Sequence, residues 1–160
     1  MHGSTFIIYL PRVTEVAEES FAKNILETSP GNNETLLLVE DDAAILKLSE
    51  RMLKKLGYRV IAANSPLAAI AMAQNYQEPI DLLITDVIMP ELNGRDLATR
   101  LQGIISGLKV LFMSGYTSDV IFNRGVMDKD VFLLQKPFSK NELASKIREV
   151  LTKSQPSDIV

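Results

Sequence analysis

The sequence predicts an α/β fold in which helices cover both faces of an open, five-stranded parallel sheet. Strand-like and helix-like patterns alternate five times between residues 34 and 152, and this alternation is typical of a doubly wound sheet. Right-handed crossovers leave few possible strand orders, of which we expect 2-1-3-4-5. Polar residues follow several of the strands, and ligands of such sheets bind at the carboxyl ends of the strands.

The expected strands are short and apolar. Leu36–Val39 is an uninterrupted apolar run, as expected for a parallel strand that is buried on both faces. The other four expected strands are Tyr58–Ala62, Ile80–Thr85, Lys109–Met113 and Val131–Leu134.

The expected helices have recognisable ends and regularly spaced apolar residues. Ser65 and Pro66 suit the N-cap and the first position of a helix, Gly57 suits a left-handed helix end, and Ser139 with Glu142 forms a capping box. A further short helix is expected at residues 118–125. The residues expected to face the sheet are Ile45, Leu48, Met52 and Leu56 (helix 43–56), then Leu67, Ile70 and Ala71, then Leu97, Leu101 and Ile104 (helix 95–105), and finally Leu143, Ile147, Val150 and Leu151.

A cluster of helix-breaking residues around Pro30 and Gly31 separates this domain from the N-terminal region. Within that region, Val16, Ala17 and Phe21 have the spacing of a short helix. The expected organisation is a strand at residues 4–10 closed by Pro11, a linker at residues 12–33, the α/β domain at residues 34–153 and a flexible tail at residues 154–160.

Composition limits the classes of function. The net charge is −3 without a strong basic patch, so we expect no direct binding of nucleic acid. The absence of cysteine excludes disulfides and thiolate metal sites. We find no apolar run of membrane-spanning length and no signal peptide. His2 is the only histidine, so any histidine chemistry must come from another domain or chain.

Polar side chains follow four of the expected strands, and together they suit a magnesium ion and a phosphoryl group. Carboxylate oxygens are magnesium ligands, and an ammonium acts as a point charge against phosphate. Each residue alone has a plainer explanation as a helix cap or a turn residue, so the inference depends on their lying together. The residues are Asp41 and Asp42 after the first strand, Asp86 after the third, Ser114 after the fourth and Lys136 after the fifth.

Missing motifs narrow the chemistry further. The sequence has no G-x-x-x-x-G-K-[ST] loop to cradle a nucleotide, and the globular part has no serine–histidine or cysteine–histidine pair. An aspartate is therefore the expected nucleophile, forming an acyl phosphate on its own carboxylate.

At this point residues 34–152 resemble the receiver domain of two-component response regulators, which has a flavodoxin-like fold. The resemblance implies that Asp86 is the phosphoacceptor and that Ser114 and Lys136 hold the phosphoryl group. It also implies Mg²⁺ as cofactor, with Asp41, Asp42, Asp86 and the backbone carbonyl of Ile88 as ligands. The motifs that carry it are Asp41-Asp42, the stretch 86–94 (DVIMPELNG), the stretch 113–116 (MSGY) and Lys136-Pro137-Phe138, where the family's proline usually follows a cis bond.

One position departs from the family. An aromatic residue often stands three positions before the lysine and couples to phosphorylation, but Leu133 stands there in this chain. Phe132 is one step earlier, and adjacent strand residues face opposite sides of a sheet. We therefore expect Phe132 not to replace the missing aromatic side chain.

The N-terminal stretch 3–11 (GSTFIIYLP) is similar to the last strand of the ATP-binding domain of sensor histidine kinases. With the linker and the receiver, the resemblance implies the C-terminal part of a hybrid histidine kinase whose ATP-binding residues lie outside this chain. It implies a cytoplasmic domain that catalyses its own phosphorylation and dephosphorylation. The implied partner is a histidine kinase domain or a histidine phosphotransfer protein, and we expect the fragment to be a monomer or weak dimer without direct membrane contact.

Two other functions remain open from the sequence. A magnesium-dependent phosphohydrolase would also use an aspartyl phosphate, but such enzymes usually have a second carboxylate two residues after the nucleophile, where this chain has Ile88. A binding module with the same fold but without phosphorylation is the other, and the complete acidic set disfavours it.

Overall fold

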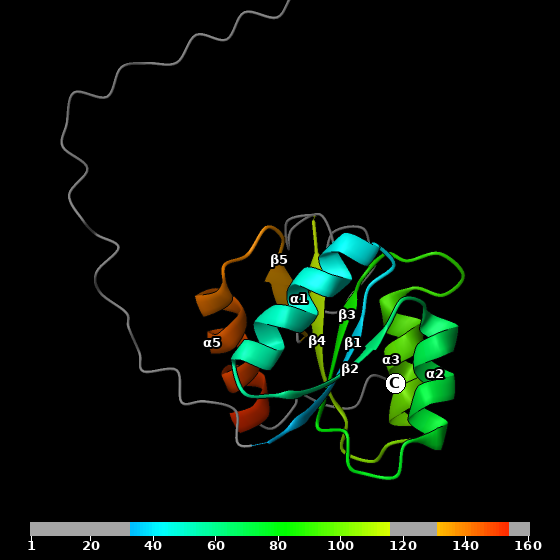
Figure 1. Cartoon of the computed structure of the whole chain (residues 1–160). Coiled ribbons are helices and arrows are strands. Elements are labelled where there is room, and N and C mark those ends of the chain that lie inside the picture. Colours follow the sequence, from blue (N-terminus) through cyan, green and yellow to red (C-terminus); the bar gives the residue numbers. More distant parts are fainter. Residues whose placement is uncertain (1–32, 116–130, 154–160) are drawn as a thin grey trace, which may run out of the picture.

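The computed structural model describes residues 33–115 and 131–153 and confirms the expected fold (Figure 1). Five parallel strands form one sheet in the order β2-β1-β3-β4-β5. The strands agree with the sequence prediction to within two residues at each end. They are β1 (Thr35–Val39), β2 (Arg59–Ala63), β3 (Leu82–Asp86), β4 (Lys109–Ser114) and β5 (Phe132–Gln135).

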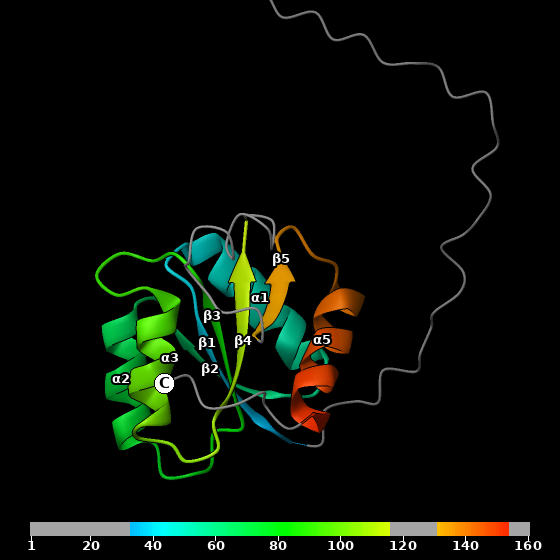
Figure 2. The same cartoon turned by 180° about the vertical axis from the view of Figure 1, so that it is seen from behind.

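Helices cover both faces of the sheet. Helices α1 (Ala43–Lys55) and α5 (Lys140–Thr152) lie on one face, and α2 (Pro66–Asn75) and α3 (Gly94–Gln102) lie on the other (Figures 1 and 2). The strand expected at residues 4–10, the linker, the helix expected at residues 118–125 and the C-terminal tail lie outside the described residues.

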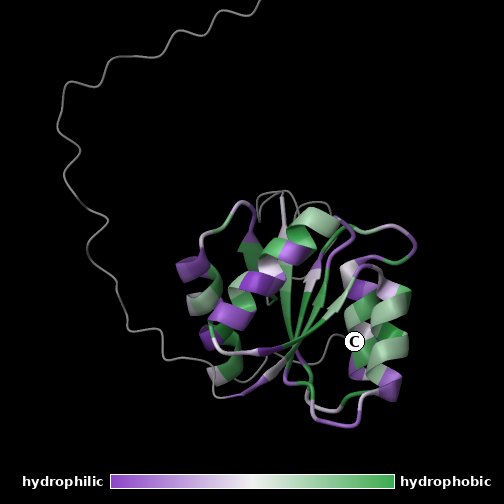
Figure 3. Ribbon diagram, in the orientation of Figure 1, coloured by the Kyte–Doolittle hydropathy of each residue, from purple (hydrophilic) through white to green (hydrophobic). Residues whose placement is uncertain are grey.

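The sheet divides the apolar core into two layers. Leu37 and Val39 of β1 pack with the α2 and α3 side, whereas Leu36 and Leu38 pack with the α1 and α5 side, and all four are fully buried. Figure 3 shows the apolar strands at the centre and hydrophilic residues on the outer surfaces of α1 and α5. Among the described residues, no helix is long and apolar enough to cross a membrane.

The buried face of α1 differs from the expected one. Leu48 was expected to face the sheet but is 55% exposed, whereas Ser49 and Leu53 are buried. Ile45 and Met52 are only partly buried. The apolar residues of α1 spread over more than one face, so their spacing alone placed the buried face about one residue out of phase.

Helix α2 departs from the prediction in the same way. Leu67 is 54% exposed and Ala71 is exposed, while Ala69 and Ala73 are buried. The helix carries no charged residue, and Figure 3 shows it apolar over most of its length, so the sequence has no polar face to fix its rotation. Ile104 is also 44% exposed, because α3 ends at Gln102, before the end expected from sequence.

The capping residues predicted at Gly57, Ser65 and Ser139 are confirmed. Ser65 Oγ accepts a hydrogen bond from Ala68 N at 3.2 Å, and Gly57 has a φ of 89° at the end of α1. In the capping box of α5, Ser139 Oγ accepts from Glu142 N at 3.2 Å, and Ser139 N donates to Glu142 Oε2 at 2.7 Å. The hydrogen bond from the Ser139 backbone lowers the pKa of Glu142.

The packing of α1 predicts opposite outcomes for the same substitution at two positions. Leu53→Ala should lower the free energy of unfolding by about 2–5 kcal/mol because it leaves a cavity against the sheet. Leu48→Ala should lower it by less, because that side chain is 55% exposed and its loss leaves no cavity against the sheet. Urea titration measures both, and equal losses would contradict the packing of α1 described above.

Candidate functional site

The sheet register brings residues that are far apart in the sequence to one edge. Asp86 is the last residue of β3 and pairs with Met113 of β4. Ser114 follows Met113 and ends β4, and its carbonyl accepts a hydrogen bond from Lys136 N at 2.7 Å. Asp86, Ser114 and Lys136 therefore lie together at the carboxyl ends of the strands, as the sequence predicts.

Lys136 is the central cation of this edge. Its Nζ donates to Asp86 Oδ2 at 2.7 Å and to Glu40 Oε2 at 2.5 Å. The side chains of Lys136 and Asp86 are only 15% and 17% exposed, and that of Glu40 is 1% exposed. Because water screens buried charges poorly, the ammonium holds both carboxylates in place.

Three carboxylates form a compact group beside this lysine. Glu40, Asp41 and Asp86 each offer an oxygen, and these oxygens lie within 4.8 Å of one another. Hard divalent cations such as Mg²⁺ bind oxygen ligands of this kind. The donor set therefore fits a magnesium ion.

Asp42 lies outside this group, although the sequence interpretation made it a metal ligand. Asp42 Oδ1 accepts hydrogen bonds from Ala44 N at 2.8 Å and Ile45 N at 3.0 Å and so caps α1. These backbone donors lower the pKa of Asp42. The plainer explanation that the sequence also offered for an aspartate here, a helix cap, describes Asp42.

Sequence reasoning missed Glu40. It directly follows β1, and its N–H donates to Ala63 O at 3.2 Å, so Glu40 continues the pairing of β1 with β2. The signal was present in the sequence, since Glu40 is the first charged residue after a buried apolar run. The sequence interpretation chose the adjacent pair Asp41-Asp42 instead.

Burial and hydrogen bonding shift the pKa values of this site in opposite ways. Burial raises the pKa of Glu40, and the neighbouring Lys136 only partly offsets this effect. Burial opposes the charged form of Lys136, but hydrogen bonds to Asp86 and Glu40 outweigh it and raise the pKa of Lys136. The lysine therefore stays an ammonium over the whole physiological range, while Glu40 is the carboxyl that burial makes easier to protonate.

The backbone after Asp86 is held by close packing with the start of α3. Gly94 N donates to Val87 O at 3.0 Å, and a Cβ at Gly94 would lie only 2.1 Å from Asp86 O. Asn93 caps α3 by accepting from Asp96 N at 2.9 Å. Glycine at position 94 thus allows α3 to begin directly against the backbone of Asp86.

Gly115 follows Ser114, and a Cβ added there would meet no other described residue within 4 Å. Ile88, whose carbonyl is a predicted ligand, is 58% exposed. The Lys136–Pro137 peptide bond is cis.

The structure confirms that Phe132 and Leu133 face opposite sides of the sheet. Phe132 is 9% exposed and packs in the layer of α1 and α5, whereas Leu133 packs against the layer of α2 and α3. No aromatic side chain therefore stands at the position three residues before Lys136.

Comparison with known proteins gives a consistent result. A sequence model of the response regulator receiver domain matches residues 36–148. Sensor kinase CckA of Brucella abortus (strain 2308) is 32% identical and aligns with 94% of this chain, which spans only 17% of CckA. Response regulator receiver protein CpdR of the same organism is 33% identical, over 72% of this chain and 95% of CpdR.

Solved structures agree with these matches. The receiver domain of the hybrid histidine kinase CckA superposes with a TM-score of 0.62 at 32% identity, covering 74% of this chain and 99% of that domain. The chemotaxis protein CheY4 of Vibrio cholerae superposes with a TM-score of 0.65 at 25% identity, covering 74% of this chain and 99% of CheY4.

The contact at Gly94 predicts that Gly94→Ala displaces the backbone of Asp86. We expect it to lower the free energy of unfolding by about 1–3 kcal/mol, as overpacking typically does. Gly103→Ala is the matched control at the other end of α3, because Gly103 has an ordinary helical φ of −68° and a Cβ there would lie no closer than 3.4 Å to its neighbours. Denaturant titration measures both, and a neutral Gly94→Ala would contradict the close packing.

The raised pKa of Glu40 predicts a pH-dependent effect of Glu40→Gln. In wild type, Glu40 keeps its proton to higher pH in the folded state than in the unfolded chain. The protonated carboxyl therefore adds to the free energy of unfolding at low pH, and this contribution is lost as the pH rises from the unfolded pKa through the folded pKa. The unfolding free energy of Glu40→Gln minus that of wild type should therefore become more positive between pH 4 and pH 7 in metal-free buffer. Urea titrations across this range test the sign, and the opposite trend would contradict it.

Proposed function

The chain belongs to the response regulator receiver domain family of two-component phosphorelay systems, and we propose that Asp86 accepts a phosphoryl group from a phosphohistidine. The observation that carries this proposal is the 2.7 Å contact between Lys136 Nζ and Asp86 Oδ2 in a group of converging carboxylates. A partly buried carboxylate held by an ammonium at the carboxyl edge of a parallel sheet is well placed for phosphoryl transfer.

In the proposed step, a carboxylate oxygen of Asp86 forms a bond to phosphorus while the phosphorus–nitrogen bond of the donor breaks. The imidazole leaves with the electron pair of that bond and takes up a proton. Phosphoryl transfer depends mainly on positioning and charge stabilisation. Lys136 supplies a positive charge 2.7 Å from the acceptor carboxylate, and Ser114 lies on the adjacent strand to hold a phosphoryl oxygen.

The metal ligands we propose are Glu40, Asp41 and Asp86, together with the backbone carbonyl of Ile88. Glu40 takes the place that sequence reasoning gave to Asp42, because the Asp42 carboxylate caps α1. When bound, Mg²⁺ supplies positive charge that neutralises the carboxylates and the phosphoryl oxygens.

Phosphorylation would shift a conformational equilibrium centred on Ser114 and the segment that follows it. A ligand shifts such an equilibrium only through contacts that differ between the two states, and a phosphoryl group on Asp86 adds new contacts to Ser114 and Lys136. With Leu133 three residues before Lys136, this shift proceeds without the usual aromatic side chain. Hydrolysis of the acyl phosphate or onward transfer resets the domain.

The larger protein that we propose is a hybrid histidine kinase with this receiver at its C-terminal side. The alignment with CckA covers 94% of the chain and so extends beyond the receiver range. In this proposal residues 1–11 end the ATP-binding domain and residues 12–33 are the linker. The phosphodonor is a histidine kinase domain or a histidine phosphotransfer protein, and the receiver works in the cytoplasm.

Intact-mass measurement after incubation with acetyl phosphate tests the acceptor. Wild type should gain one phosphoryl group in the presence of Mg²⁺ and none after chelation, and Asp86→Asn should gain none under either condition. Labelling of Asp86→Asn at another residue would reject the assignment.

The same assay separates the two candidate metal sets. Glu40→Gln and Asp41→Asn should raise the Mg²⁺ concentration needed for half-maximal labelling. Asp42→Asn is the matched control, because asparagine is an equally good N-cap, and it should leave that concentration unchanged. A larger effect of Asp42→Asn than of Glu40→Gln would restore Asp42 as the ligand.

A further inference from the structure

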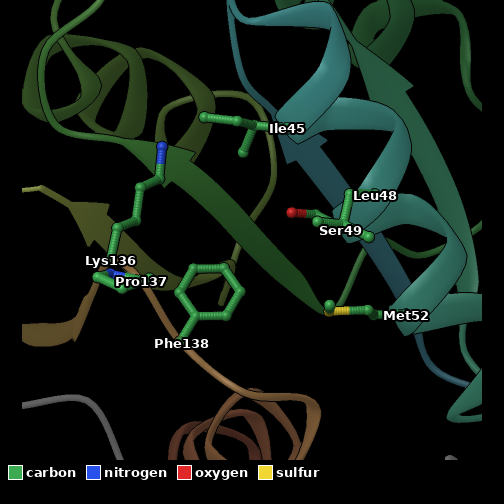
Figure 4. Close-up of a pocket in the computed structure, with 7 residues that line it drawn as sticks. All are labelled: Ile45, Leu48, Ser49, Met52, Lys136, Pro137 and Phe138. Carbon is green, nitrogen blue, oxygen red and sulfur yellow. The ribbon is translucent and has the colours of Figure 1, made fainter.

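An apolar groove runs along α1 beside the candidate site. It encloses about 320 Å³ and lies between Ile45, Leu48 and Met52 of α1 on one side and Pro137 and Phe138 on the other (Figure 4). Leu48 is 55% exposed, so the groove presents a large apolar side chain to solvent. An apolar groove of this kind is a typical seat for the apolar face of an amphipathic helix.

The outer surface of α1 is basic. The helix carries four basic residues and one acidic residue, Glu50. Lys54 pairs with Glu50 at 2.6 Å, whereas Lys47 and Arg51 are exposed and have no ion pair within the part of the chain that the structure describes. An occupant of the groove that carries carboxylates on its outer face would complement this surface.

The chain enters the domain at the same end of the molecule as the C-terminal ends of α1 and α5 (Figures 1 and 2). Two contacts fix this entry point. Arg59 Nε donates to Asn33 O at 3.1 Å, and Arg148 Nη1 of α5 donates to Glu34 Oε1 at 2.8 Å. Whatever precedes Asn33 is therefore tethered beside the layer of helices that contains the groove.

The segment before this entry point has a matching chemical pattern. Val13, Ala17, Phe21 and Ile25 recur every four residues and would share one face of a helix. The acidic residues between them fall mostly on the opposite face. They are Glu15, Glu18 and Glu19.

The lengths also agree. A helix over residues 13–27 would be about 22 Å long, close to the length of the 13-residue α1 at about 20 Å. The five residues 28–32 that would join it to Asn33 include Pro30 and Gly31 and span up to about 17 Å when extended. A short tether of this kind gives a high effective concentration of the segment at the groove.

We propose that residues 13–27 dock as an amphipathic helix in the groove between α1 and Phe138. Their apolar face lies against Leu48 and Phe138, and their carboxylates face Lys47 and Arg51. Lys136 lines the groove and also contacts Asp86, so the docked segment lies beside the candidate site. The docking does not depend on phosphorylation and is independent of the proposed function.

Disulfide trapping in the full 160-residue chain tests the docking, since the natural sequence contains no cysteine. Ser20→Cys is a near-isosteric change next to Phe21, and it is combined with Leu48→Cys in the groove or with Leu67→Cys on α2. These two leucines are matched, at 55% and 54% exposure, on opposite faces of the sheet. The equilibrium of each cysteine pair with a glutathione buffer gives the effective concentration of its two thiols. This value should be at least tenfold higher for the pair with Leu48→Cys than for the pair with Leu67→Cys, and the disulfide should form within one chain.

A second pair of variants separates docking from mere tethering. Val13→Asp with Ile25→Asp leaves the tether length unchanged but places carboxylates on the apolar face. It should lower the effective concentration of the Ser20→Cys and Leu48→Cys pair at least fivefold, while a cooperative urea transition shows that the α/β domain remains folded. Equal trapping at Leu67→Cys, no response to the aspartates, or disulfides that join two chains would each overturn the proposal.

Discussion

The sharing of the Lys136 ammonium by the buried Glu40 carboxylate and the partly buried Asp86 carboxylate is the interaction on which the site depends. Glu40 and Asp86 both lie within 2.7 Å of its Nζ, and Asp41 completes a group of three acids. Like charges at this distance repel one another. A cation, the lysine alone or the lysine with a divalent ion, offsets this repulsion and so holds the three carboxylates together.

The fold meets this requirement by means of its topology. In the order 2-1-3-4-5, β1 and β3 are neighbours, so Glu40 and Asp86 lie side by side at their ends. Lys136 directly follows β5, which is separated from β3 by β4. The start of α3 packs on the backbone of Asp86 at Gly94, and Asp42 is used to cap α1. The local structure thus holds Glu40, Asp86 and Lys136 at one edge of the sheet, while the Asp42 carboxylate binds the first turn of α1.

The sequence was sufficient for the strands and helices that the structure describes, the strand order and the meeting of Asp86 with Lys136, because apolar strands and crossover rules leave few alternatives. It was not sufficient where two neighbouring residues compete for one role. Glu40 and Asp42 both flank Asp41, and only the pairing of β1 with β2 and the start of α1 determine which one turns inward. The sequence also did not determine how α1 and α2 are rotated about their axes. In α1 the apolar Leu48 lies outside the buried face, and α2 has no charged residue to mark its exposed face.

A crystal structure with Mg²⁺ and beryllium fluoride, which mimics a phosphoryl group on a carboxylate, tests the central claim most directly. The account predicts the fluoride complex on Asp86, with Lys136 Nζ in contact with it, Mg²⁺ beside Asp41 and Asp86, and Asp42 still bound to the first turn of α1. A complex formed on another residue, or Asp42 turned into the metal site with Lys136 remote, would contradict it.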